Sequence, residues 1–443
     1  MIVNPGINIT IGFDFGSSTT KVCYRLEADR LDKQGVVRFS NETSSSGSLF
    51  RDSVVYISSD LQYIGWKPFK DSRPFPFFKS LLIDHHSDPR KGETIREICA
   101  YFLASVLATC MQYIQYAESK HLNNKEIRWL LNFGLPVERN QPDLEASFKE
   151  VVNVAILLND VVHFHPIIRM ERWKVLYKDY IQKVPEGIYA TFTPELLAEV
   201  INVFEDPEVE QGLSMIIDVG SATVDIAVVD LDRRSSEAFY LVDFISAKVG
   251  ALGVDSTARM LGSHNSSKSY AELKESLQLE KHFSCVYNML KDLNLEIKGL
   301  EGYGDSLLNK FRGLLAATCM DAKATSILPR LKSMRSIPLY LLGGGNTYHW
   351  YKFWPKDVHS DRLLRCGIPR FSYQQLYCQK SLPSVDQSNL HRFRVASGLT
   401  KQETMLKVSG YPWHFDRFEH HPFKQMVMDH DSLELIKREK YGN

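Results

Sequence analysis

The stretch Ile7–Leu26, INITIGFDFGSSTTKVCYRL, decides the fold, because two apolar, β-branched runs flank a turn of glycine and serine. This pattern predicts a β-hairpin rather than a strand that leads into a helix. The segment Ser214–Leu231, SMIIDVGSATVDIAVVDL, repeats the arrangement, again with an aspartate before the turn. A third segment, Ile337–Asn346, IPLYLLGGGN, is a buried-looking strand that runs into three glycines. We therefore expect the chemistry of this chain at the ends of three strands.

Both hairpin turns have the composition of an anion-binding turn. Small residues let successive backbone N–H groups converge on an anion, and hydroxyl groups add further donors. Two such turns that face each other would hold a triphosphate from both sides. Asp14 and Asp218 enter the turns, and they are the candidate ligands of Mg²⁺ through water, because this ion prefers oxygen ligands and keeps several waters. The glycines of the third segment remove side chains where a base or ribose would press on the backbone.

Length and composition are those of a globular chain with two to three domains. The 443 residues are 44% hydrophobic and carry equal numbers of acidic and basic side chains. The zero net charge gives no overall electrostatic case for nucleic acid or an anionic membrane. The seven scattered cysteines never form a CxxC spacing, which argues against zinc and a disulfide framework. Without a signal-peptide pattern or a run of roughly 18 apolar residues, we expect a cytoplasmic protein with no membrane segment.

Other stretches predict the elements around these turns. SVVYISSDLQYIGW (53–66) predicts a strand pair with a turn near Ser59. The region from Gly92 to about Ser119 has apolar residues at helical spacing and predicts one long amphipathic helix. PELLAEVINVFED (194–206) predicts a helix with proline in its first turn. No GxxxxGK[ST] loop occurs, which excludes a P-loop nucleotide site.

The three turn segments together resemble a known family. DFGSSTTKV (14–22), DVGSATVDIAVV (218–229) and LLGGGN (341–346) are similar, in this order, to the phosphate-1, phosphate-2 and adenosine motifs of the superfamily of actin, DnaK-type heat-shock chaperones and sugar kinases. NFGLP (132–136) resembles the first interdomain crossover, and RVASGL (394–399) the second, in which Ala396 and Gly398 would make helix-to-helix contact.

Within the superfamily, the DnaK-type nucleotide domain is the nearest in pattern. FFKSLLID (77–84) and SAKVGALGVD (246–255) resemble two further DnaK segments. The resemblance makes Lys79 the transition-state cation, Glu195 a second ligand of Mg²⁺ or water, and Asp218 the residue that positions the attacking water. It implies ATP and Mg²⁺ as cofactors. The implied nucleotide-binding residues are Asp14, Gly16, Ser17, Ser18, Thr19, Lys21, Gly220, Ser221, Ala222, Thr223, Asp225, Gly343, Gly344, Gly345 and Asn346.

The sequence departs from DnaK in three respects. Ser221 and Ala222 replace two glycines of the usual turn, and no β-sandwich substrate domain follows the nucleotide domain. Lys21 occupies the position of the phosphate-binding lysine of actin and of plasmid-partition filaments. We therefore expect a slow, DnaK-like ATPase switch that acts on a separate partner or client protein. The alternatives are an actin-like ATPase that self-associates into filaments, and a small-molecule kinase or ATP-binding pseudoenzyme.

The expected fold is α/β, a two-lobed actin-like ATPase with duplicated, ribonuclease H-like mixed sheets and flanking helices. Residues 1–210 would form the first lobe, with 34–95 as an inserted subdomain and 394–443 returning to it. Residues 211–393 would form the second lobe, with 255–335 as a helical subdomain. ATP and Mg²⁺ would lie in the cleft between the lobes.

Overall fold

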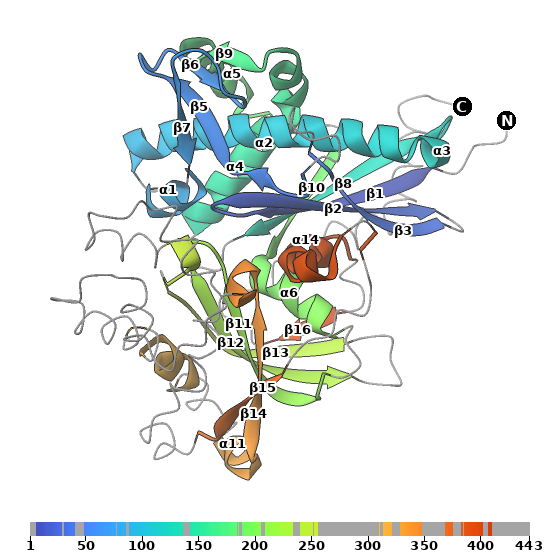
Figure 1. Cartoon of the computed structure of the whole chain (residues 1–443), viewed down its shortest axis with the longest axis vertical. Helices are drawn as coiled ribbons and strands as arrows, with labels where there is room; N and C mark the ends of the chain where they lie inside the picture. The colour runs from blue at the N-terminus through green and yellow to red at the C-terminus, as the bar shows by residue number, and fades with distance from the viewer. Residues whose placement is uncertain are drawn as a thin grey trace, which may run out of the picture.

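Two six-stranded sheets form the framework of the molecule, seen one above the other in the computed structural model (Figure 1). The structure describes residues 6–28, 31–39, 48–76, 78–85, 88–135, 142–183, 185, 188–204, 209–233, 240–250, 252–255, 310, 313–320, 328–347, 368–374, 382–383, 385–401 and 406–409. Most of the predicted helical subdomain 255–335 lies outside these residues, as do 348–367 and 410–443.

The first sheet contains the first glycine-serine turn. Its strand order is β10-β8-β1-β2-β3, with β4 beside β2. β1 and β2 form the predicted antiparallel hairpin, whereas β8 and β10 run parallel to β1. The strands are β1 (Ile7–Phe15), β2 (Thr19–Ala28), β3 (Leu31–Val36), β4 (Arg51–Asp52), β8 (Ile127–Leu135) and β10 (Ile188–Pro194).

The second sheet repeats this topology. Its order is β15-β14-β11-β12-β13-β16, in which β11 and β12 form the second predicted hairpin and β14 runs parallel to β11. The strands are β11 (Gly212–Val219), β12 (Val224–Arg233), β13 (Tyr240–Gly250), β14 (Ser336–Leu342), β15 (Arg370–Gln374) and β16 (Leu406–Ser409). The first five correspond one by one to β1, β2, β3, β8 and β10, which confirms the predicted fold class of duplicated mixed sheets.

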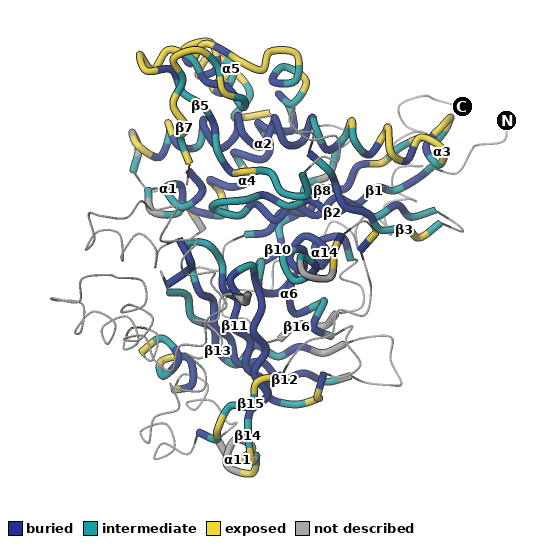
Figure 2. The backbone as a smooth tube through the Cα atoms, viewed as in Figure 1, coloured by how far each residue is buried: buried dark blue, intermediate teal, exposed yellow. Residues whose placement is uncertain are grey.

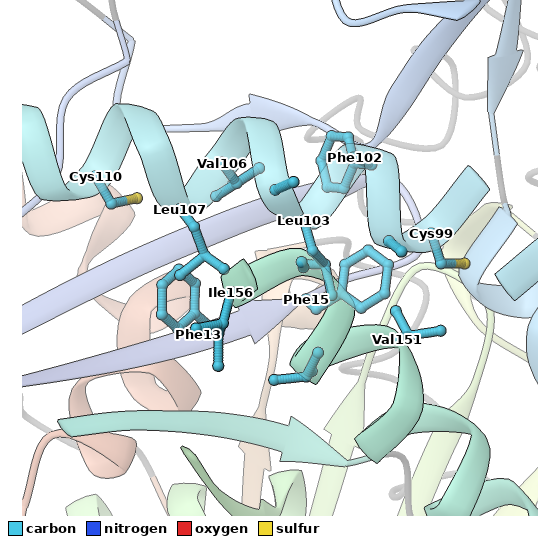
Figure 3. Packing of buried hydrophobic residues seen from close by; sticks show 14 of the residues in the cluster. Phe13, Phe15, Cys99, Phe102, Leu103, Val106, Leu107, Cys110, Val151 and Ile156 are labelled. Carbon is cyan, nitrogen blue, oxygen red and sulfur yellow. The ribbon is translucent and has the colours of Figure 1, made fainter. Parts of the chain in front are cut away.

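Two long helices cover one face of the first sheet. They are α2 (Pro89–Ala117), which confirms the predicted long helix, and α4 (Pro142–Phe164). Their apolar side chains, such as Phe102 and Ile156, meet Phe13 and Phe15 of β1 in one buried cluster (Figure 3). Phe13 also stacks on Phe133 of β8, with ring centroids 4.6 Å apart. The position of the first turn, at the end of β1, is thus fixed by the core directly beneath it.

Helix α2 is also apolar enough to cross a membrane by length and composition. The candidate segment is Lys91–Ala117, and 78% of its most apolar window is buried inside the protein. The sequence is expected to contain no such segment, so this stretch differs from that expectation. A helix packed on the core passes the same criterion, because its apolar face covers a sheet.

A small subdomain lies beyond α2, at the edge of the first lobe (Figure 1). Its four-stranded sheet has the order β7-β5-β6-β9, and exposed residues are frequent on it (Figure 2). β5 and β6 form the strand pair predicted from 53–66. Residues 167–180 contribute to it as well as the predicted insert 34–95. Its elements are β5 (Val54–Ser58), β6 (Tyr63–Gly65), β7 (Ser72–Pro76), β9 (Ile167–Arg169) and α5 (Met170–Tyr180), and the chain leaves β7 through α1 (Phe78–His85).

The lobes are connected where α6 (Glu195–Phe204) crosses α14 (Arg394–Leu399), between the two sheets (Figure 1). A Cβ atom on Gly398 would lie 1.9 Å from the carbonyl oxygen of Ala198, so only glycine permits this approach. The predicted helix-to-helix contact is thus made by Gly398. Ala396 instead contacts β1. A Cβ atom on Gly12 would lie 2.2 Å from the carbonyl oxygen of Ala396.

The described C-terminal strand differs from the predicted lobe assignment. The sequence analysis assigned 394–443 to the first lobe, but β16 pairs with β13 of the second sheet. Likewise α6, inside the predicted first lobe, packs its apolar side chains into the core of the second sheet. The reason is geometric, because the segments that link two lobes contact both of them. The remaining short elements are α3 (Ser119–Leu122), α11 (Leu328–Ser333), η1 (Gly344–Thr347) and η2 (Gln387–Phe393).

Candidate functional site

The first turn connects β1 to β2 through Gly16, Ser17 and Ser18. The backbone N–H of Gly16 donates to the carbonyl of Asp14 at 3.0 Å. A Cβ atom on Gly16 would lie 2.4 Å from the carbonyl oxygen of Thr19, so this tight turn requires glycine. Thr19 begins β2. The turn therefore has the compact backbone that an anion-binding turn needs.

Asp14 and Lys21 face each other across the hairpin. They are partners in the strand register, and Nζ of Lys21 donates to Oδ2 of Asp14 at 2.7 Å. Both side chains are largely buried, with 13% and 9% of their surface exposed. A predicted phosphate-binding cation and a predicted Mg²⁺ ligand are thus directly paired at the first turn.

The second turn is held by the segment Leu252–Asp255. The N–H of Gly220 donates to Thr223 within the turn. The carbonyls of Gly220, Ser221 and Ala222 accept hydrogen bonds from the backbone N–H groups of the covering segment, at 2.7 to 3.1 Å. The Ser221 hydroxyl also donates to Asp255. This anchoring shapes the turn that contains Ser221 and Ala222.

The third segment lies directly against the second turn. β14 runs parallel to β11, and Leu342 is the register partner of Asp218. Gly343 has a φ of +76°, and a Cβ atom there would lie 1.9 Å from Oδ1 of Asp218. A Cβ atom on Gly345 would lie 2.2 Å from Val219. Position 343 therefore requires glycine for both backbone conformation and space, and position 345 requires it for space. Of the two, Gly343 is the one that meets the predicted catalytic side chain of Asp218. Gly344 and Asn346 follow in η1.

Lys79 and Glu195 come from different elements and form an ion pair. Lys79 is on α1 and Glu195 begins α6, and Nζ lies 2.6 Å from Oε1. Lys79 is only 3% exposed, so its side chain is buried rather than solvated at the surface. Its ammonium group also lies 5.6 Å from the centre of the Phe15 ring, one residue after Asp14. A buried cation thus stands beside the first turn.

The pKa of the Asp218 carboxyl depends on charged residues from the first hairpin, from α1 and from the crossover helix α6. Burial, followed by the carboxylates of Glu195 and Asp14, raises the pKa of Asp218 to about 7, while Lys21 and Lys79 oppose the rise. These four residues come from the first lobe and from α6. The entry aspartates of the two turns are thus within electrostatic range of one another, as expected if the turns serve one ligand. Asp225, the register partner of Asp218, is 6% exposed.

Two further charged residues of this site were missed by the sequence analysis. Glu199 lies one turn after Glu195 on α6 and is 1% exposed, while Arg394 begins α14 and is 7% exposed. Burial and the Asp218 carboxylate raise the pKa of Glu199 well above its ordinary value, and Arg394 opposes this. In the described part of the chain, Oε2 of Glu199 and Nε and Nη1 of Arg394 have no hydrogen-bond partner. In the sequence, these two residues are marked only by being charged within the otherwise apolar crossover helices α6 and α14.

The predicted metal ligands are the two aspartates that enter the hairpin turns. Among the described residues, no group of three or more His, Cys, Asp or Glu side chains is arranged to hold a metal ion. Asp14 and Asp218 supply carboxylate oxygens, the donor type that Mg²⁺ prefers, and the ion ordinarily retains waters and phosphate oxygens as its other ligands. The predicted Mg²⁺ role of these two residues stays a prediction.

Comparison with known proteins gives a structural similarity only. No model of a known protein family and no curated protein matches this sequence. Among solved structures, the crystal structure of MreB5 of Spiroplasma citri bound to ADP is similar, with 11% sequence identity and a TM-score of 0.41. The match covers 89% of this chain and 94% of that chain. The two-lobed fold of this chain follows from the repeated strand order of its two sheets.

Proposed function

We propose that this chain binds ATP with Mg²⁺ between its two hairpin turns and hydrolyses it slowly, as a switch that controls a separate partner protein. The observation that supports this proposal is that Asp218, at the end of the second hairpin, is within electrostatic range of Asp14 at the end of the first hairpin and of the Lys79–Glu195 ion pair. Two sheets with the same topology present a glycine turn at the same strand end, which suits a ligand with several phosphates.

Each side chain has a distinct task in this proposal. Lys79 stabilises the charge that develops on the phosphoryl group, and Glu195 holds the lysine in place. Asp218 orients the attacking water, and a carboxyl with a pKa of about 7 exchanges protons readily near neutral pH. Mg²⁺, when bound to the phosphates, neutralises part of their charge. The serine and alanine of the second turn agree with slow turnover, which suits a switch.

We further propose that this switch works as a DnaK-type nucleotide domain does. This part of the proposal rests on the sequence motifs, including Lys79 and the 246–255 segment, which is held against the second turn by backbone hydrogen bonds. ATP and ADP would stabilise different lobe arrangements, because only ATP contacts both turns with its terminal phosphate. A partner that prefers one arrangement would then bind in a nucleotide-dependent manner.

The decisive experiment compares the wild type with Asp218→Asn. We expect calorimetry to detect binding of ATP with Mg²⁺ to both proteins, with affinities within a few-fold of each other. Phosphate release by the variant should fall by about 100-fold or more, since positioned acid–base groups contribute on this order. Asp32→Asn, at a side chain with 67% of its surface exposed, is the matched control and should behave as wild type. Absence of ATP binding by the wild type would overturn the proposal.

A second candidate function is an ATPase that assembles with copies of itself. The observation that favours it is the pairing of Lys21 with Asp14 beside the first turn, because the lysine at this position resembles that of filament-forming relatives. Light scattering on the same calorimetry samples separates the candidates. A rise in scattering with ATP supports assembly, and a flat signal with bound ATP supports the switch.

A further inference from the structure

Ser53 makes two hydrogen bonds to the first turn and one to the strand that follows it, although no motif identifies it. Its hydroxyl donates to the carbonyl of Gly16 at 2.7 Å, and its backbone N–H donates to the carbonyl of Ser18 at 2.9 Å. The hydroxyl oxygens of Ser53 and Thr20 lie 3.1 Å apart. Ser53 itself is only 2% exposed. One buried serine therefore contacts the turn at its first and last residues and also the beginning of β2.

The direction of these bonds follows from the donors available. A serine hydroxyl has one hydrogen, which Ser53 gives to Gly16. Thr20 must therefore be the donor in its bond to Ser53. The carbonyls of Gly16 and Ser18 therefore both accept a hydrogen bond from Ser53.

Ser53 also stands at a junction between two sheets. It follows β4, which pairs with β2 of the first sheet, and precedes β5 of the small subdomain. The chain leaves the small subdomain through α1, where the Ser80 hydroxyl donates to the Ser17 hydroxyl at 3.0 Å. Lys79 of the same helix pairs with Glu195. Both connections between β5–β7 and the lobe thus contact the first turn or the predicted catalytic cluster.

We propose that Ser53 is a positioning residue of the nucleotide site, which couples the first turn to the small subdomain formed by β5, β6, β7, β9 and α5. This proposal rests on the proposed function, since it concerns the same ATP site. Closing the turn on phosphate fixes Ser53, and Ser53 fixes the start of β5. Coupling between two sites is reciprocal, so a protein bound to the small subdomain would change ATP affinity by the same factor that ATP changes its binding.

The test combines calorimetry with hydrogen exchange, for the wild type and Ser53→Ala. In the wild type, ATP with Mg²⁺ should slow amide exchange in residues 54–76. In the variant, the carbonyl of Gly16 and the hydroxyl of Thr20 lose a partner. We expect ATP affinity to fall about tenfold, the effect of losing one or two hydrogen bonds, and the ATP-dependent protection of 54–76 to disappear. Ser53→Thr keeps the hydroxyl and should restore both.

Ser58→Ala is the matched control. Ser58 is also buried, in β5, and accepts the backbone N–H groups of Gln62 and Tyr63 at 3.0 and 2.9 Å, without any bond to the turn. The Ser58→Ala variant should loosen the sheet of the small subdomain and leave ATP affinity unchanged. The coupling would be overturned if Ser53→Ala kept the ATP affinity and the ATP-dependent protection of the wild type. It would also be overturned if Ser58→Ala lost as much ATP affinity as Ser53→Ala.

Two outcomes need separate treatment. If Ser53→Ala does not fold, Ser80→Ala replaces it, and unchanged ATP affinity together with an unchanged exchange response overturns the proposal. If the wild type binds no ATP, the proposed function itself fails and the coupling fails with it. Binding by the wild type without any effect of Ser53 overturns the coupling alone.

Discussion

At the scale of single residues, Asp218 makes the stability of this protein depend on pH. Burial and nearby carboxylates raise its pKa in the folded state to about 7, above the ordinary value of 3.8. The folded state thus holds a proton that the unfolded chain releases. The stabilisation is complete below about pH 4 and is lost as the pH rises through 7. We expect Asp218→Asn, which keeps a neutral side chain, to exceed the wild type in free energy of unfolding by roughly 4 kcal/mol at pH 8, at about 1.4 kcal/mol per pKa unit.

Urea unfolding without nucleotide, at pH 5 and pH 8, checks this expectation. The difference between variant and wild type should be small at pH 5 and large at pH 8. Glu199 acts in the same direction, because burial raises its pKa too. Asp32→Asn, at an exposed position, should show no pH-dependent difference. A constant difference for Asp218→Asn at both pH values would mean that its carboxylate is not destabilised by its surroundings.

At the scale of elements, the contact between α6 and α14 depends on Gly398. A methyl group there would meet the backbone of Ala198, which cannot move without separating the helices. We expect Gly398→Ala to lower the free energy of unfolding by about 1–3 kcal/mol, the usual cost of overpacking, despite alanine's better helix propensity. Thermal or urea unfolding measures the change.

Gly313 supplies the control for this prediction. It lies in the helical segment 313–320, and nothing lies within 4 Å of the place its Cβ atom would occupy. Gly313→Ala should be neutral or stabilise by up to about 1 kcal/mol. Equal effects at the two glycines would show that helix propensity, rather than the helix contact, decides the outcome.

The elements around the site were largely predictable from the sequence, because they are determined by local sequence patterns. Both hairpins combine β-branched runs with a short glycine turn, and α2 has a clear helical period. The tertiary contacts of individual side chains were harder to predict from the sequence. Ser53 and Arg394 look like ordinary residues in the sequence, because their roles depend on contacts between segments far apart in the chain. Lys79 could be singled out by resemblance, but its burial and its pairing with Glu195 appear only when α1 and α6 are brought together.

At the scale of the whole molecule, two separate cores meet at a small joint. The first sheet has its own cluster with α2 and α4, and the second sheet shares a cluster with α6. Between them, in the described part of the chain, lies a cluster of Ala198, Val395 and Leu399. Asn202 of α6 adds polar contacts across this joint, with Arg394 and Lys401.

A nucleotide that contacts both turns should therefore stabilise the molecule as a unit. At an ATP concentration 100 times the dissociation constant, we expect the free energy of unfolding to rise by about 2.7 kcal/mol. We also expect the unfolding temperatures of the two lobes to become more similar. Calorimetric melting with and without ATP and Mg²⁺ measures both effects. Gly16→Ala, whose Cβ atom would collide with the carbonyl of Thr19, is the control and should show neither. If ATP binds the wild type but stabilises only one transition, the nucleotide is held by a single lobe, and closure of the two lobes is not how its presence is signalled.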